Sequence, residues 1–95
     1  MEHLNGRIVR ACAGRDKDGL FFVTGVSGGY LLLADGKRRK FAHPKRKSSG
    51  HVEPVDMTGF EHPVIGKLNQ SEPVSDRELR RALAAFKEGI TRGER

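Results

Sequence analysis

Short apolar runs separated by turn residues dominate the first half of the chain. Residues 7–13, 20–26 and 30–34 are rich in β-branched, aromatic or leucine side chains, and glycine, serine or aspartate flanks them. Runs of this length and composition are typical of β-strands. Two further short strands are predicted at residues 39–42 and 51–55. The pattern therefore predicts five short antiparallel strands in little more than half of the chain.

Five strands in so short a segment favour a closed sheet, because closure removes edges that a small chain cannot otherwise cover. The predicted fold class is mainly β: a small five-stranded barrel over residues 1–56. Phe41 is expected to anchor the fourth strand, and Pro44 to end it, since proline has no N–H to donate to a sheet. Phe21 and Phe22 are expected on opposite faces of their strand, one of them under the terminal helix.

The second half of the chain changes from strand patterns to helix patterns. Residues 57–74 contain two prolines and two glycines. They predict a linker with a short helical turn near residues 64–68. After the barrel (residues 1–56) and the linker (residues 57–74), residues 75–90 are predicted to form a C-terminal helix that is packed on the barrel or appended to it.

The C-terminal helix is predicted over residues 75–87, with Gly89 near its end. Ser75 and Glu78 have the spacing of a capping box, in which each side chain binds the backbone N–H of the other residue. Apolar residues recur at intervals of three and four and predict one buried stripe. The stripe consists of Leu79, Ala82, Leu83 and Phe86.

Charge is distributed unevenly along the chain. The formal net charge of the 95 residues is +6, with a balance of +7 in residues 1–50 and −1 in residues 51–95. Residues 37–47 hold seven Lys or Arg, one His and no acid. Like charges at this density repel one another unless an anion lies against them. A polyanion is therefore the expected partner, and nucleic acid is the favoured polyanion.

Other classes of function find little support in the sequence. Cys12 is the only cysteine, so it excludes an intrachain disulfide, and between two alanines it is expected as small core filler. No zinc spacing, dinucleotide fingerprint, P-loop or catalytic triad pattern is present. No apolar run approaches the roughly 18 residues of a membrane span, and the first residues lack a signal-peptide pattern. We expect a cytoplasmic monomer that is not an enzyme, has no cofactor or metal and does not bind membranes.

An ordered set of motifs resembles a known family. The matching segments are residues 6–9 (Gly-Arg-Ile-Val), 14–17 (Gly-Arg-Asp-Lys), 22–23 (Phe-Val), 34–40 (Ala-Asp-Gly-Lys-Arg-Arg-Lys) and 44–47 (Pro-Lys-Arg-Lys), followed by His51. Together they resemble the bacterial KOW-domain RNA-binding proteins, which are related to archaeal and eukaryotic KOW-type large-subunit ribosomal proteins. The resemblance covers roughly residues 5–55. Asp18 departs from it, since the family pattern has glycine directly after the lysine.

The resemblance implies an SH3-like barrel whose loops bind RNA. It favours ribosomal RNA as the target and a ribosome- or translation-associated role. It carries over Arg15 and Lys17, in the loop between the first two strands, as RNA contacts. The second basic segment is matched by Lys37, Arg38, Arg39, Lys40, His43, Lys45, Arg46, Lys47 and His51. Because few aromatic side chains are expected to be exposed, recognition of the phosphate backbone and of RNA shape is favoured over base recognition.

Two alternatives stay open. The same charge suits a DNA-binding or nucleoid-associated protein. The barrel face or the C-terminal helix could instead bind a translation or transcription factor, which would make the protein an adaptor. Tyr30 could stack on a base, although a half-buried position in its strand is the favoured interpretation.

Overall fold

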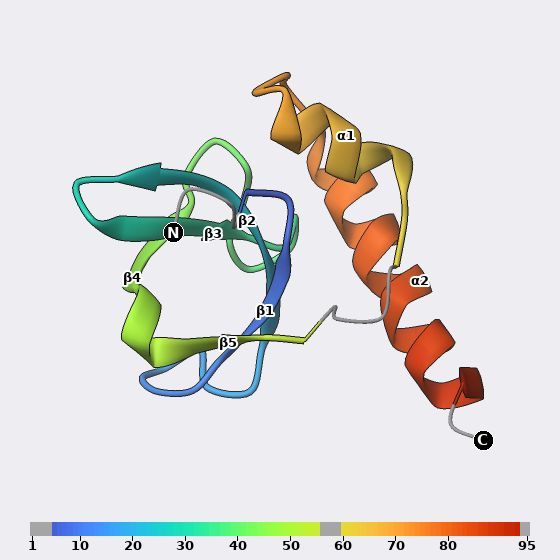
Figure 1. Cartoon of the computed structure of the whole chain (residues 1–95), viewed down its shortest axis with the longest axis horizontal. Helices are drawn as coiled ribbons and strands as arrows, with labels where there is room; N and C mark the ends of the chain where they lie inside the picture. The colour runs from blue at the N-terminus through green and yellow to red at the C-terminus, as the bar shows by residue number, and fades with distance from the viewer. Residues whose placement is uncertain (1–4, 56–59, 94–95) are drawn as a thin grey trace.

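The computed structural model describes residues 5–55 and 60–93, in which five strands and two α-helices are formed (Figure 1). These elements are β1 (Ile8–Ala11), β2 (Leu20–Ser27), β3 (Tyr30–Ala34), β4 (Lys45–Ser48), β5 (Val52–Pro54), α1 (Pro63–Asn69) and α2 (Asp76–Gly93). The strands form one antiparallel sheet in the order β4-β3-β2-β1-β5. The prediction of a mainly β chain with a C-terminal helix is confirmed. The start of the predicted linker, at residues 57–59, lies outside the described residues.

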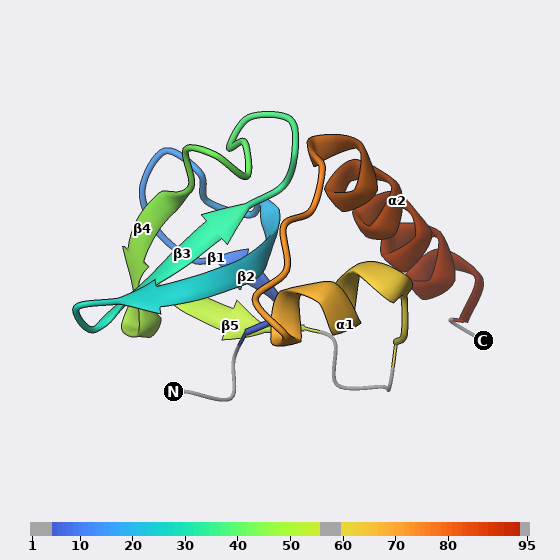
Figure 2. The ribbon, with the colours of Figure 1, turned by 90° about the horizontal axis from the view of Figure 1, so that it is seen from above.

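The sheet carries a buried apolar cluster on each face. One cluster is made by the strands themselves and consists of Val9, Ala11, Phe21, Val23, Leu31 and Leu33. The other joins the sheet to both helices and consists of Ile8, Phe22, Ala34, Val64, Leu68, Val74, Leu79, Ala82, Leu83 and Phe86. Phe21 and Phe22 fall in different clusters, as their alternation in a strand predicts. Figure 2 shows both helices on the same side of the sheet.

The predicted fourth strand is wrong. Residues 39–42 form bends and a turn, and β4 begins directly after Pro44. Proline therefore precedes the strand instead of ending it. β4 pairs with β3, with Lys47 opposite Leu31 and Lys45 opposite Leu33. Phe41 does serve as an anchor, but from the turn, where it packs against the cluster under the helices.

The prediction that Cys12 fills the core is also wrong. Cys12 is exposed and lies just after the end of β1. Ala11 occupies the inward position at the end of that strand. Since side chains alternate between the faces of an extended chain, the next residue points outward.

The two helices lie close to their predicted places. α1 contains the predicted turn at residues 64–68, and α2 continues past Gly89 to Gly93. The prediction that Gly89 ends the helix is therefore wrong, because an interior glycine costs only about 1 kcal/mol. Within residues 5–55 and 60–93, no helix is long and apolar enough to span a membrane.

The capping box at the start of α2 is confirmed. The Ser75 hydroxyl accepts from the Glu78 N–H at 3.0 Å, and the Glu78 carboxylate accepts from the Ser75 N–H at 2.9 Å. Lys67 of α1 donates to the same carboxylate at 2.6 Å. These bonds hold the pKa of Glu78 below its usual value, with Lys67 as the largest cause. The start of α2 is thereby fixed relative to α1.

Removal of the cap tests this arrangement. Ser75→Ala is expected to lower the free energy of unfolding by about 1 kcal/mol, because one helix N–H loses its acceptor. Urea unfolding followed by circular dichroism measures the change. Ser75→Asp keeps an acceptor at the same position and is expected to stay within about 0.5 kcal/mol of the wild type. Equal losses in both variants would contradict a capping role for Ser75.

Candidate nucleic-acid interface

The predicted RNA contacts lie on two loops, one strand and one short 3-10 helix. Arg15 and Lys17 lie in the loop between β1 and β2, residues 12–19, which we call the first loop. The loop between β3 and β4, residues 35–44, is the basic loop and carries Lys37, Arg38, Arg39, Lys40 and His43. Lys45, Arg46 and Lys47 lie on β4, and His51 ends the 3-10 helix Ser49–His51.

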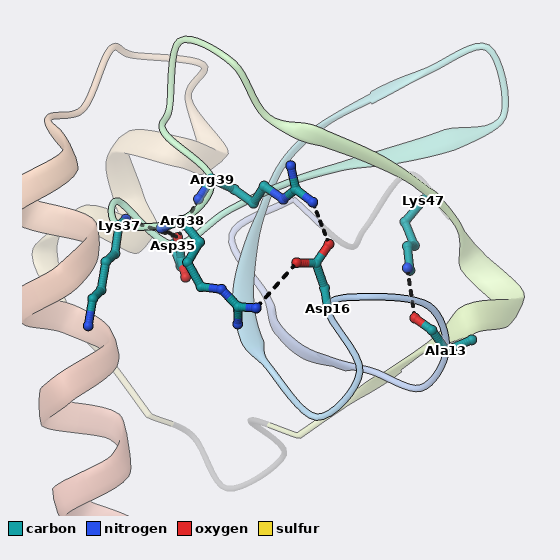
Figure 3. A network of polar contacts seen from close by, with 7 residues as sticks. All are labelled: Ala13, Asp16, Asp35, Lys37, Arg38, Arg39 and Lys47. Carbon is teal, nitrogen blue, oxygen red and sulfur yellow. Dashed lines mark hydrogen bonds and ion pairs between the residues drawn. The ribbon is translucent and has the colours of Figure 1, made fainter.

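Asp16 joins the first loop to the basic loop. Its side chain is buried, with 3% of the residue exposed. The Arg39 guanidinium donates to it at 2.9 Å, and the Arg38 guanidinium lies 4.0 Å away (Figure 3). Residues far apart in the sequence are thus brought together by one carboxylate. This role of Asp16 was not predicted, although its position between Arg15 and Lys17 is visible in the sequence.

The charge state of Asp16 reflects these neighbours. Burial by itself raises the pKa of a carboxyl group, because the charged form loses water. The hydrogen bond and charge of Arg39, followed by the charges of Arg38 and Lys45, outweigh the burial. The pKa of Asp16 therefore lies below its ordinary value, and the junction is ionised at neutral pH.

Lys47 forms the second link to the first loop. It is 9% exposed, and its ammonium group donates to the Ala13 carbonyl at 2.9 Å. Its position opposite Leu31 places it on the face of the strand cluster. Figure 3 shows this link beside the Asp16 junction. Lys47 and Arg39 thus have internal partners, and both are less exposed than the other Lys and Arg side chains of the two loops.

Asp18, the residue that departs from the family pattern, faces Arg10. It adopts a left-handed conformation with φ of 70°, and its backbone N–H donates to the Ala11 carbonyl at 2.8 Å. Its carboxylate lies 3.5 Å from the Arg10 guanidinium. Arg10 also binds Glu53, and this hydrogen bond is the main reason that the pKa of Arg10 is raised. The added negative charge therefore has a partner of its own at the base of the loop.

The basic loop is shaped by the residue that starts it. Asp35 Oδ1 accepts from the backbone N–H groups of Lys37, Arg38 and Arg39, each at 2.9 Å. An aspartate that binds the following N–H groups fixes a turn. Lys37 and Lys40 are exposed, and 57% of the Arg38 side chain is exposed. The tight turn therefore presents cations at the surface.

The N-terminal end of α2 holds the basic loop in place. The Gly36 carbonyl accepts from Arg80 at 2.7 Å, and the Asp76 carboxylate accepts from the Phe41 N–H at 2.7 Å. Gly36 has φ of 80° and packs directly against the Asp76 backbone. Arg80 and Asp76 were missed as residues of the site. Their contacts reach across the fold, so only the charges of these two residues were visible in the sequence.

Arg46 lies outside the two loops. Its guanidinium carbon is 4.9 Å from the centre of the Tyr30 ring, and Tyr30 is 42% exposed. A cation at this distance from an aromatic face is attracted to it. Arg46 thus already covers one face of the aromatic ring that could have stacked on a base.

The sequence matches neither a protein-family model nor a curated protein. Among the described residues, no group of three or more His, Cys, Asp or Glu is arranged to hold a metal ion.

Proposed function

We propose that this chain is an RNA-binding protein that contacts the phosphate backbone of structured RNA through the first loop and the basic loop. Ribosomal RNA is the favoured target. The observation that carries the proposal is the Asp16 junction, because it holds two cationic loops together. Five cations of these loops remain exposed: Arg15, Lys17, Lys37, Arg38 and Lys40. Loops fixed before binding lose less conformational entropy when the RNA arrives. The KOW resemblance favours RNA over DNA.

We also propose that the sheet closes as an SH3-like barrel. β4 and β5 are the two ends of the sheet, yet only the 3-10 helix Ser49–His51 separates them in the chain. The Lys47 side chain reaches from β4 to the carbonyl of Ala13, beyond the end of β1. The short connection and this hydrogen bond both support closure. The barrel would give the two loops a rigid base.

Salt dependence tests the RNA-binding proposal. If the five exposed loop cations contact phosphates, the logarithm of the affinity is expected to fall with a slope of about −3.5 to −4.5 against the logarithm of salt concentration. The double variant Lys17→Gln, Lys37→Gln is expected to reduce the size of that slope by about 1.4 to 1.8. Fluorescence anisotropy with a structured ribosomal RNA fragment measures both slopes.

The matched control is Arg77→Gln, Arg81→Gln, which removes the same charge from exposed positions of α2. Its slope is expected to equal that of the wild type. Equal slopes for all three proteins, or tighter binding of duplex DNA at the same salt concentration, would overturn the proposal. Crosslinking in cells identifies the target: wild-type protein should recover a defined ribosomal RNA region, and the loop variant should recover less of it.

A further inference from the structure

A groove of about 510 Å³ lies between α2 and the basic loop. It is lined by Gly19, Leu20, Asp35, Lys37, Arg38, Arg80, Leu83, Ala84 and Lys87. Volumes of about 300–1,000 Å³ are typical of sites for small ligands. The groove touches the first loop at Gly19 and the basic loop at Lys37 and Arg38. It therefore adjoins the proposed RNA-binding surface and extends it onto the helix.

The lining combines apolar and cationic side chains. Leu20, Leu83 and Ala84 provide apolar surface, and Leu83 belongs to the buried cluster under α2. The four basic side chains come from the basic loop and from one face of the helix. The one acid, Asp35, already accepts three backbone N–H groups through Oδ1. The groove is thus suited to a ligand with an anionic part and a flat, weakly polar part.

We propose that this groove binds one unpaired nucleotide of the RNA, with its phosphate at the cationic side chains and its base against Leu20, Leu83 and Ala84. The inference rests on the RNA-binding function proposed above. Paired bases in an A-form helix are stacked and cannot enter a groove, whereas bulged nucleotides can be turned out of the helix.

Two neighbouring alanines on α2 allow a matched test. Ala84 and Ala85 are both exposed, but only Ala84 lines the groove. Ala84→Glu places a carboxylate one helical turn from Arg80 and Lys87, where its negative charge repels a phosphate in the groove. Ala85→Glu makes the same change of charge outside the groove. Glutamate is a good helix former, so both variants are expected to fold.

The probes are a fully paired RNA duplex and the same duplex with one bulged adenosine. Wild-type protein is expected to prefer the bulged duplex. Ala84→Glu is expected to weaken binding of the bulged duplex by about five- to tenfold relative to Ala85→Glu. The two variants are expected to bind the paired duplex alike. In addition, the bulged duplex should shift the methyl NMR resonances of Leu20 and Leu83 in the wild-type protein.

The outcomes separate the two proposals. If the wild-type protein binds both duplexes equally and the two variants do not differ, the nucleotide site is overturned and RNA binding stands. If the wild-type protein binds neither duplex with the expected salt dependence, the proposed function fails and the groove proposal fails with it. A loss in Ala84→Glu that is equal for both duplexes would also overturn the site for an unpaired base.

Discussion

Gly36→Ala is expected to lower the free energy of unfolding by about 3–5 kcal/mol. A β-carbon at this position would lie 2.2 Å from the Asp76 carbonyl oxygen, which is part of the helix backbone. The residue also has φ of 80°, a conformation that side chains resist. The loop would have to move away from α2, and the hydrogen bonds to Gly36 and Phe41 would be lost with it.

Gly29→Ala is the control that separates the effect of the close approach to Asp76 from the effect of the positive φ. Gly29 has nearly the same φ, 85°, but among the described residues nothing lies within 4 Å of a β-carbon there. Its loss is expected to be about 1–2 kcal/mol, from backbone strain alone. Urea unfolding of the two variants measures the difference. Equal losses would show that the approach of Gly36 to α2 contributes nothing to stability.

Asp16→Asn is expected to lower the free energy of unfolding by about 2 kcal/mol at neutral pH. The substitution preserves shape but removes the charge that faces Arg39 and Arg38, and it leaves the partly buried Arg39 without its anion. Asp18→Asn is the control, because the Asp18 side chain is 70% exposed and its ion pair with Arg10 is at the surface. The control is expected to lose less than about 1 kcal/mol.

The loss in Asp16→Asn is also expected to depend on pH. The pKa of Asp16 is lowered in the folded state, so its contribution is complete above the unfolded value of about 3.9. The contribution disappears as the pH falls through the lower folded value. Urea unfolding from pH 7 down to pH 3 should therefore show the wild type and Asp16→Asn converging in acid. A difference that stays constant with pH would mean that the charge of Asp16 is not responsible.

Four of the strands, β1, β2, β3 and β5, could be predicted from their own residues and from the turn residues beside them. In β2, apolar residues occupy both faces, and each face has a cluster to fill. β4 could not be predicted, because Lys45, Arg46 and Lys47 contain nothing that marks a strand. Its conformation comes from pairing with β3, which is a property of the folded chain and not of the segment.

The candidate site also combines features that single residues specify with features that depend on contacts in the folded chain. Charge density identified the basic loop, because charge is a property of each residue. The roles of individual cations depend on contacts between distant segments: Arg39 and Asp16 are 23 positions apart, and Arg80 and Gly36 are 44 apart. The sequence therefore indicated a cationic surface without showing which cations hold the fold together.

The placement of three cations on β4 has a consequence for self-association. β4 is an end strand in the order of the sheet, and among the described strands it pairs only with β3. Even where side chains close the barrel, its outer backbone edge can therefore pair with a second copy of the chain. Two copies approaching along this strand would bring Lys45 and Arg46 against identical charges. The repulsion opposes edge-to-edge aggregation at the same time as the charge favours a polyanion. The cations of β4 thus oppose pairing of this strand with β4 of a second copy of the chain.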